Sequence, residues 1–340
     1  MKAAVYRGPG DVRIESIADP EGAREGELII QVARAAICGT DSSEWAHGPL
    51  LARPPVVLGH EFVGRVVDAG SAAGAFAVGD RVVSGAGISC GMCEWCSAGR
   101  TNLCAEYRTI GLHVDGGLAE YVRSPGFVCR HVPEGVSDDA AALAQPLSVA
   151  LHAVRRSGLE SGQACALIGV GGIGAFILAA AAARGASPLI ALDIDDERLH
   201  TARRLGATVT VNVRERSLSD AIFENTNGEG AHVVIEASGS RNAPAAALAA
   251  ARRGGRVLIV GLQAAPREID LFSFTVREVD LLTTLAHVCD VDLPESLALL
   301  DSSDLATAVI DRVIALDDLV ADGIKPLADG SARGKIVVAP

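Results

Sequence analysis

Between residues 35 and 61 the chain carries side chains of the types that bind a catalytic metal ion. They are Cys38, Thr40, Asp41, His60 and Glu61. Thiolate, imidazole and carboxylate groups are zinc ligands, and an open catalytic zinc site takes about three protein ligands. The cysteine and the His-Glu pair each adjoin a glycine, so we expect both at strand ends or turns. Singly, each would more often be a core or surface residue, and the prediction depends on two further patterns.

Four cysteines form the second pattern, namely Cys90, Cys93, Cys96 and Cys104. Disulfides and a metal ion are both possible interpretations. Residues 1–10 lack the apolar segment of a secretory signal peptide, so we expect a reducing, cytoplasmic compartment, which disfavours disulfides. Successive CxxC spacings let four thiolates converge on one tetrahedral ion, so we predict a closed structural zinc site. The remaining Cys129, Cys165 and Cys289 lack this spacing and are predicted to be core or incidental thiols.

The third pattern is a glycine-rich turn between a predicted strand at 164–170 and a predicted helix at 175–186. It reads Gly169-Val170-Gly171-Gly172-Ile173-Gly174. Such a turn indicates dinucleotide binding when an acidic residue ends the next strand, as Asp193 does for the strand predicted at 187–194. The first glycine permits the tight turn, the second lets the backbone approach the pyrophosphate, and the last allows close helix–strand packing. The helix N-terminus would present its amides to the phosphates.

Asp193 also predicts which dinucleotide binds. Its carboxylate would accept hydrogen bonds from the adenosine ribose and would repel a 2′-phosphate. No arginine directly follows it in Ile194-Asp195-Asp196. Arg198, a little further on, could lie near the adenine, and the alternative is a solvated surface residue. We therefore predict NAD in preference to NADP.

The N-terminal part of the chain is predicted to be rich in β-structure. Short apolar or alternating runs separated by turn signals predict strands at 1–7, 11–17, 27–37, 56–70 and 79–87. Gly79-Asp80 is a hairpin signal, and a partly closed barrel of short strands accounts for the whole pattern. Residues 138–157 then become helical in character, with a bend expected at Pro146.

Further strand–helix–strand units follow the glycine turn. A strand is predicted at 231–239, a helix at 244–255 and a strand at 256–262, which indicates an α/β fold with a Rossmann-type doubly wound parallel sheet. The tail from residue 295 mixes a helix with short strands and is expected to return to the first domain. We therefore place the dinucleotide-binding domain at residues 148–289 and the β-rich domain at residues 1–147 and 290–340.

Composition limits the possible partners. The 340-residue chain has a formal net charge of −12 and a pI near 5.1, whereas nucleic acid and anionic membranes attract clustered Lys and Arg. We expect neither as a partner. Residues 164–183 are uncharged and long enough to span a bilayer, but their glycines favour a buried strand followed by a buried helix.

Together these motifs resemble the zinc-containing medium-chain alcohol dehydrogenase superfamily over nearly the whole chain. The resemblance rests on Cys38-Gly39-Thr40-Asp41, Gly59-His60-Glu61, the four cysteines, the glycine turn and Gly334-Lys335. Trp45-Ala46-His47-Gly48 and Gln145-Pro146 look closest to the polyol branch, to which sorbitol, 2,3-butanediol and threonine dehydrogenases belong. The resemblance implies that the β-rich domain is a GroES-like catalytic domain carrying the four-cysteine zinc lobe.

By this resemblance, Cys38 and His60 would ligate the catalytic zinc, with Glu61 as a direct or exchangeable ligand. Thr40 would hydrogen-bond the substrate oxygen and begin proton removal. Asp41 would contact the zinc-bound histidine and orient its ring. The implied cofactors are NAD and two zinc ions per chain, one catalytic and one structural.

Two positions depart from the family pattern. The fourth ligand position holds Gln145 where the polyol branch usually has Glu; its amide oxygen could ligate zinc, or the side chain could cap the bend before Pro146. The position of the usual relay histidine holds Ser43, whose hydroxyl can pass a proton but cannot buffer one near neutral pH. His47 could substitute, and a surface histidine is the alternative.

These inferences predict a zinc-dependent enzyme that reversibly oxidises a secondary alcohol, polyol or vicinal diol to the ketone with hydride transfer to NAD. A glucose-type sugar dehydrogenase, suggested by Gln145, is the alternative within the superfamily. A non-catalytic nucleotide-binding protein is the alternative outside it, and a zinc-free quinone reductase fits less well. The expected partners are the small-molecule alcohol or ketone and, as the resemblance implies, other copies of the chain, in a homodimer or homotetramer joined through the nucleotide-domain sheet.

Overall fold

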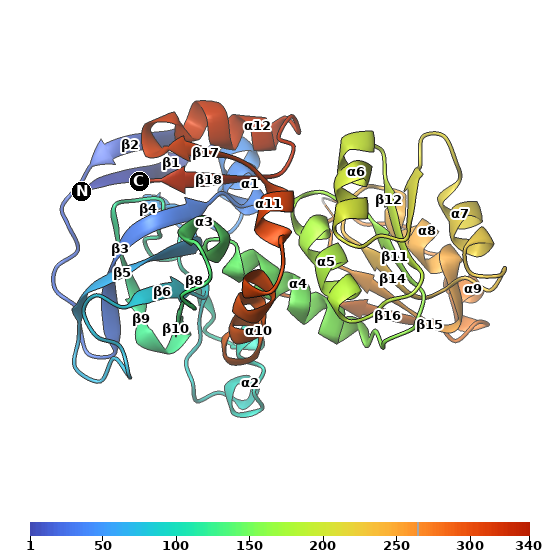
Figure 1. Cartoon of the computed structure of the whole chain (residues 1–340), viewed down its shortest axis with the longest axis horizontal. Coiled ribbons are helices and arrows are strands. Elements are labelled where there is room, and N and C mark those ends of the chain that lie inside the picture. Colours follow the sequence, from blue (N-terminus) through green and yellow to red (C-terminus); the bar gives the residue numbers. More distant parts are fainter. Residues whose placement is uncertain (264) are drawn as a thin grey trace. The chain divides into compact units, whose positions relative to one another are not determined.

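The chain divides into two units that each contain sheet structure (Figure 1). In the computed structural model, which describes residues 1–263 and 265–340, unit 1 comprises residues 1–148 with 288–340 and unit 2 comprises residues 149–287. The sequence analysis set the corresponding boundaries after residues 147 and 289. Each unit is described separately below.

Unit 1 is rich in short strands, as its apolar runs predict. These strands are β1 (Lys2–Gly8), β2 (Asp11–Ser16), β3 (Glu27–Ala36), β4 (Val56–Val57), β5 (Glu61–Ala69), β6 (Arg81–Ser84), β7 (Gly87–Ile88), β8 (Arg108–Thr109), β9 (Tyr121–Pro125), β10 (Cys129–His131), β17 (Ile310–Ala315) and β18 (Lys335–Ala339). The main sheet has the order β10-β6-β5-β3-β18-β17, with β9 also paired to β3, and β2-β1-β4 form a smaller sheet. Because β18 pairs with β3, the C-terminal tail returns to this unit, where both chain ends lie (Figure 1).

Helical segments connect the strands of unit 1. They are α1 (Gly39–His47), α2 (Glu94–Ser97), α3 (Asp138–Ala141), α10 (Cys289–Asp301), α11 (Leu305–Val309) and α12 (Lys325–Ala328), with short 3-10 helices at Thr101–Leu103, Gly126–Val128 and Leu316–Asp318 and a π-helical turn at Leu319–Ile324. Helix α4 (Ala144–Ser157) crosses from unit 1 into unit 2. The sequence analysis did not identify α1, because its buried residues are the polar Asp41, Ser42 and Glu44 and no apolar stripe marks it.

Unit 2 is a parallel sheet with helices on its faces, which confirms the predicted Rossmann-type fold. Its elements are β11 (Cys165–Ile168), α5 (Gly172–Ala183), β12 (Leu189–Asp193), α6 (Asp196–Arg204), β13 (Val209–Asn212), α7 (Leu218–Glu224), β14 (Ala231–Glu236), α8 (Ala243–Ala250), β15 (Ala251–Ile259), α9 (Leu271–Thr275) and β16 (Asp280–Thr283). The strand order is β13-β12-β11-β14-β15-β16. The strands β12 and β13 are therefore added on one side of β11 and the strands β14 to β16 on the other, so the strand order reverses between β11 and β14. Figure 1 shows α5 and α6 on one side of this sheet and α7 and α8 on the other. Ligands of such sheets bind at the carboxyl ends of the strands beside this reversal.

Two predicted helices differ in the structure. The run at 138–157 divides into α3 and α4 at residues 142–143, and Pro146 lies in the first turn of α4. A proline there loses no hydrogen bond, because the amides of the first turn have no intrahelical partner. The helix predicted at 244–255 ends at Ala250, since residues from Ala251 onward pair with β14 and this pairing overrides the helical propensity of the alanine run.

The hairpin predicted at Gly79-Asp80 is instead the end of a longer loop. The antiparallel strands β5 and β6 are joined by residues 70–80. Gly79 has a φ of +98°, and the Asp80 side chain accepts a hydrogen bond from the Ala77 amide at 2.8 Å, so a turn does form at the dipeptide. The strand predicted at 79–87 divides into β6 and β7.

The uncharged run at 164–183 divides into β11 and α5 around the glycine turn, as expected. Among the residues that the structure describes, no helix is both long enough and apolar enough to cross a membrane. The alanine-rich composition of this run therefore reflects burial within unit 2, where Phe176 and Leu178 of α5 are fully buried.

We expect Phe176→Ala to lower the free energy of unfolding by about 3–5 kcal/mol, because removing a fully buried ring leaves a cavity in unit 2. Phe127→Ala is the matched control, since that ring is 54% exposed and its loss should change stability by only about 0.5 kcal/mol. Urea unfolding followed by circular dichroism measures both values. Equal effects of the two substitutions would contradict the packing described here.

Candidate functional site

The antiparallel pairing of β3 with β5 brings the two halves of the predicted metal site together. The pairing places Ala36 opposite Glu61. Cys38 follows shortly after Ala36 and His60 directly precedes Glu61, so the thiol and the imidazole meet at the same end of the sheet. Gly59 has a φ of +98°, and a Cβ there would lie 2.5 Å from a neighbouring backbone amide, so the turn into this pair requires glycine.

Donor atoms of three side chains converge at this end of the sheet. One ligand atom each of Cys38, His60 and Glu61 lies within 4.8 Å of the others. His60 and Glu61 are buried, and Cys38 is half-buried. Three donors of these types can share one tetrahedral zinc ion and leave a position for a further ligand. The donor set therefore fits a catalytic zinc.

Asp41 contacts both halves of this cluster. Its Oδ2 accepts a hydrogen bond from the Cys38 amide at 2.9 Å, and its Oδ1 lies 4.0 Å from His60 Nδ1. Within residues 1–263 and 265–340, neither that oxygen nor that ring nitrogen has a hydrogen-bond partner. Burial raises the pKa of Asp41, although His60 opposes this effect. The position of Asp41 fits that of a carboxylate that would orient the ring of a metal-binding histidine.

The charges around His60 favour a cation. Burial by itself would lower the pKa of His60, but the fields of Cys38, Asp41 and Glu61 raise it to about 10. The same negative groups that stabilise a protonated His60 would also stabilise a metal ion bound to the neutral ring in place of the proton. The electrostatics of the cluster and the chemistry of its donors thus agree.

Lys335 is a site residue whose role the sequence analysis missed, although it quoted the residue as part of a motif. Lys335 is buried on β18, and its Nζ donates to the Ile37 carbonyl at 2.9 Å and, over a short contact, to the Glu61 carboxylate. Burial would lower the pKa of Lys335, but Glu61 and Cys38 raise it above its ordinary value. A lysine that begins an apolar strand was the available signal, because a buried lysine needs a partner.

The other residues predicted for catalysis occupy α1 and α4. The Thr40 hydroxyl lies 3.6 Å from the Cys38 sulfur, which brings Thr40 to the cluster. Ser43 is half-buried on α1, one turn after Thr40. His47 is exposed at the end of α1, in agreement with the alternative of a surface histidine. Gln145 is buried in the first turn of α4.

The four cysteines of the lobe also converge. The sulfur atoms of Cys90, Cys93, Cys96 and Cys104 lie within 4.8 Å of one another, and none of the four forms a disulfide. The Cys90 amide donates to the Cys104 sulfur at 3.2 Å. Backbone amides lower the pKa of Cys93 to about 6, whereas burial and then Cys93 raise that of Cys96 to about 11. A cation among the four sulfurs would relieve this competition, so the lobe fits a structural zinc.

The three cysteines outside both clusters are core thiols. Cys129 and Cys165 are buried and Cys289 is half-buried. Burial raises the pKa of Cys129 to about 11 and those of Cys165 and Cys289 to about 12. Their reactivity as thiolates is correspondingly low.

In unit 2 the glycine turn lies between β11 and α5, as predicted. Gly169 has a φ of +91°, and a Cβ on Gly174 would lie 2.0 Å from the Gly169 carbonyl oxygen, so both positions require glycine. A Cβ on Gly172 would meet nothing within 4 Å, and one on Gly171 would meet only Arg198 at 4.0 Å. The space outside the turn is therefore open, and it fits the phosphates of a dinucleotide at the N-terminus of α5.

Asp193 ends β12 and holds this turn in place. Its Oδ2 accepts a hydrogen bond from the Val170 amide at 2.6 Å, and its Oδ1 accepts one from the Ile194 amide at 2.7 Å. Arg198 Nη1 lies 3.9 Å from that Oδ1, so Arg198 lies beside the turn and not in bulk solvent. Ile173, in the first turn of α5, is half-buried.

Comparison with known proteins identifies the family. The family model described as alcohol dehydrogenase GroES-like domain matches residues 24–134, and the model described as zinc-binding dehydrogenase matches residues 172–302. Sorbitol dehydrogenase of Bacillus subtilis is 37% identical over 266 residues, which are 77% of this chain and 75% of that protein. The chain belongs to the zinc-containing medium-chain alcohol dehydrogenase superfamily and, within it, to the polyol branch.

Solved structures agree with this assignment. The 2R,3R-butanediol dehydrogenase from Bacillus subtilis matches with a TM-score of 0.92 and 29% identity, over 100% of this chain and 99% of that one. A zinc-binding dehydrogenase from Sinorhizobium meliloti 1021, bound to NADP, matches with a TM-score of 0.92 and 32% identity, over 100% and 99% of the two chains. The predicted GroES-like and Rossmann-type fold is confirmed. The chain is an oxidoreductase of this family, with zinc and a nicotinamide cofactor as its cofactors.

We expect Lys335→Met to lower the free energy of unfolding by about 3–5 kcal/mol, because it removes the buried ammonium group that donates to the Glu61 carboxylate. Lys2→Met is the control, since it removes an exposed pair with Asp317 and should cost no more than about 1 kcal/mol. Urea unfolding after chelation measures both values without a metal ion that could replace the lysine. A loss no larger in Lys335→Met than in Lys2→Met would show that the pair does not hold Glu61.

Proposed function

We propose that this chain is an NAD-dependent zinc dehydrogenase that reversibly oxidises a secondary alcohol, in the form of a polyol or vicinal diol, to the ketone. The observation that carries the proposal is the convergence within 4.8 Å of donor atoms from Cys38, His60 and Glu61. The glycine turn of unit 2 supports a dinucleotide as the hydride acceptor. The names of the relatives described above, sorbitol and butanediol dehydrogenases, support the substrate class.

A bound zinc ion would act as a Lewis acid on the alcohol oxygen, and a bound nicotinamide would take up the hydride. Asp41, whose Oδ1 lies 4.0 Å from His60 Nδ1, would orient the ring of His60 for binding, and Lys335 holds the Glu61 carboxylate beside it. The Thr40 hydroxyl, 3.6 Å from the Cys38 sulfur, would accept a hydrogen bond from the substrate hydroxyl and pass its proton on while donating its own. These residues thereby fix the geometry in which the proton leaves.

For the later part of the proton path we propose Ser43 and water. Ser43 follows Thr40 on the same face of α1 and is half-buried. Its hydroxyl passes a proton on but does not store one near neutral pH, so water is the acceptor. The exposed position of His47 offers no support for a role of this residue in the relay.

The test of the proposed function is NADH formation by the zinc-loaded protein across a panel of alcohols. The panel contains 2,3-butanediol, sorbitol, glucose, threonine and cyclic alcohols, with a chelator control. We expect turnover of a diol or polyol that is lost on chelation. Silence across the panel with both clusters loaded with zinc would contradict the substrate class, and NAD binding without any zinc-dependent turnover would favour a non-catalytic nucleotide-binding protein.

Gln145 supports one alternative substrate class, a sugar of the glucose type oxidised at its anomeric carbon. We propose Gln145, which is buried in α4, as the fourth protein residue of the zinc site. A neutral amide ligand leaves more positive charge on the ion than a carboxylate would, which favours alkoxide formation and weakens retention of zinc. Faster turnover of glucose than of the linear diols in the panel would favour this alternative.

We also propose two zinc ions per chain, one in each cluster. Cys38→Ser is expected to remove about one ion per chain and to abolish turnover, because it removes a thiolate ligand of the catalytic cluster. Cys93→Ser is expected to remove the other ion and to lower the melting temperature, since a closed four-thiolate site contributes folding energy. Metal analysis after gel filtration measures the number of zinc ions per chain in both variants. Retention of both ions in either variant would contradict the assignment of that cluster.

NAD is the proposed dinucleotide because Asp193, which ends β12 beside the glycine turn, carries a carboxylate that would repel a 2′-phosphate. We expect Asp193→Ser to lower the ratio of kcat/KM for NAD to that for NADP by about tenfold or more, the effect of losing one hydrogen bond to a charged group. Arg198, 3.9 Å from Asp193, would then be free to meet a 2′-phosphate. Glu197→Gln, at an exposed position on α6, is the control and should leave the ratio unchanged. An unchanged ratio in Asp193→Ser would contradict this assignment.

We further propose that the chain forms a homodimer or homotetramer through the sheet of unit 2, and that it works in the cytoplasm. Strand β16 stands at the end of the sheet order, where Leu281 is 40% exposed, and Phe272 of α9 is 77% exposed. Apolar surface of this kind favours association between copies. The four cysteines of the lobe, none of which forms a disulfide, support a reducing compartment.

A further inference from the structure

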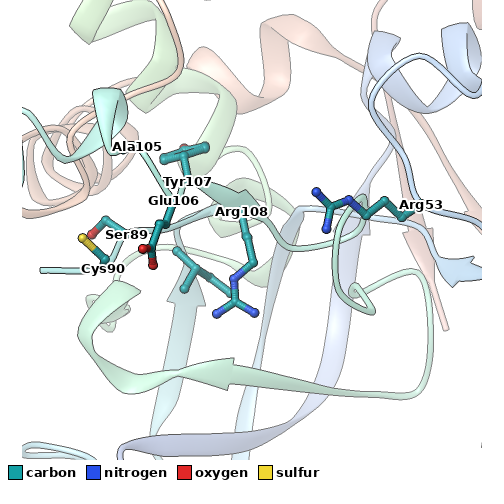
Figure 2. A pocket seen from close by; sticks show the side chains of 8 residues that line it. Arg53, Ser89, Cys90, Ala105, Glu106, Tyr107 and Arg108 are labelled. Atoms are coloured by element: carbon teal, nitrogen blue, oxygen red, sulfur yellow. The ribbon is translucent and has the colours of Figure 1, made fainter. Parts of the chain in front are cut away.

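Unit 1 contains a pocket of about 330 Å³ beside the four-cysteine lobe (Figure 2). Its lining is mostly polar and includes Arg53, Ser89, Glu106, Tyr107 and Arg108. The volume is at the lower end of the range for small-molecule sites, about 300–1,000 Å³. The pocket therefore suits a small metabolite, and its charged side chains indicate what kind of metabolite it takes.

The lobe side of the pocket is held by backbone contacts. Strands β7 and β8 pair so that Ile88 lies opposite Arg108, which fixes the base of the Arg108 side chain. The amides of Cys90 and Glu106 donate to the Cys104 sulfur at 3.2 and 3.4 Å. This wall is thus attached to the cysteine cluster, and its side chains project from a fixed frame.

Arg53 comes from the other side of the pocket. Its amide donates to the Leu112 carbonyl at 2.8 Å, which attaches its loop to the turn that carries His113. In the view of Figure 2 the Arg53 side chain extends toward the side of the pocket that carries Arg108, whose own guanidinium is directed away from Arg53. The pKa of His113 is lowered first by burial, and then by both Arg53 and Arg108. The fields of the two guanidiniums therefore overlap at one side chain.

Arg53 and Arg108 are both exposed, so their guanidiniums are open to solvent and to a ligand. In the described parts of the chain, no hydrogen bond or ion pair joins the side chain of Arg53 or Arg108 to any residue. Other arginines of unit 1 differ, since Arg34, Arg81 and Arg123 each bind a carboxylate. In the described residues Glu106 lines the same pocket without an ion pair to either arginine, so both guanidiniums are available to an anionic ligand.

We propose that this pocket binds a small organic oxyanion, whose phosphate or carboxylate group lies between Arg53 and Arg108 and whose hydroxyl groups face Glu106. Guanidinium groups form paired hydrogen bonds with the oxygens of carboxylates and phosphates, which gives both strength and orientation. The Glu106 carboxylate, which lines the same pocket, accepts hydrogen bonds from hydroxyl groups. This site is separate in chemistry from the proposed alcohol oxidation and does not depend on it.

The first test is isothermal titration of the zinc-loaded full-length chain at constant ionic strength. Glycerol 3-phosphate and gluconate are the anionic probes, and glycerol is the uncharged control. We expect saturable binding, one molecule per chain, of at least one anion and none of glycerol. Binding of only one anion assigns the group as phosphate or carboxylate. Absence of saturable binding by both anions, or equal binding of glycerol, overturns the proposal.

The second test locates the site. R53Q and R108Q should each raise the dissociation constant by about tenfold or more. R24Q is the control, because it removes the same charge from an exposed arginine of unit 1 outside the pocket. Wild-type affinity in R53Q and R108Q would show that these arginines only offset the charge of the lobe, and an equal loss in R24Q would show a general charge effect; either result overturns the proposal. NADH formation by the same preparations tests the dehydrogenase function independently.

Discussion

The register between β3 and β5 is the constraint on which the metal site depends. It places Ala36 opposite Glu61 and so brings the residues after one strand to those before the other. A slip of one residue would turn every side chain of β5 to the opposite face. A slip would bring a residue with a Cβ to the place of Gly64. A Cβ at that place would lie 2.1 Å from the Gln31 carbonyl oxygen, so the close approach there allows only the observed register. Burial of Ile30 and Phe62 in the same core fixes the pairing further.

At the end of this strand pair the protein buries several charged side chains, and such burial normally lowers the stability of the fold. Asp41, His60, Glu61 and Lys335 are all buried. Removing charged groups from water is unfavourable unless each one gains a partner. The Cys38 amide meets Asp41, and Lys335 meets both Glu61 and the Ile37 carbonyl. The resulting field favours a cation at the donor cluster. Burying these charged groups is unfavourable for folding, but it favours the binding of a metal ion.

The cysteine lobe and the glycine turn follow a different logic, because each is built within one short stretch of chain. The sulfurs from Cys90 to Cys104 converge through their own turns and amide contacts. The turn from Gly169 to Gly174 forms where Gly169 takes a positive φ and Gly174 approaches the backbone closely. The lobe also frames the pocket between Arg53 and Arg108, so one local structure supports two features of unit 1.

The sequence by itself determined the residue types of both metal clusters, the dinucleotide turn with Asp193 and the parallel sheet of unit 2. These depend on spacing over a few residues or on apolar runs, which a sequence displays directly. Only the tertiary structure decided that Lys335 pairs with Glu61 from 274 positions away and that the alanine run becomes a strand at Ala251. The physical reason is that these outcomes depend on contacts between strands, whose pairing energy outweighs local preference and whose partners the neighbouring residues do not identify.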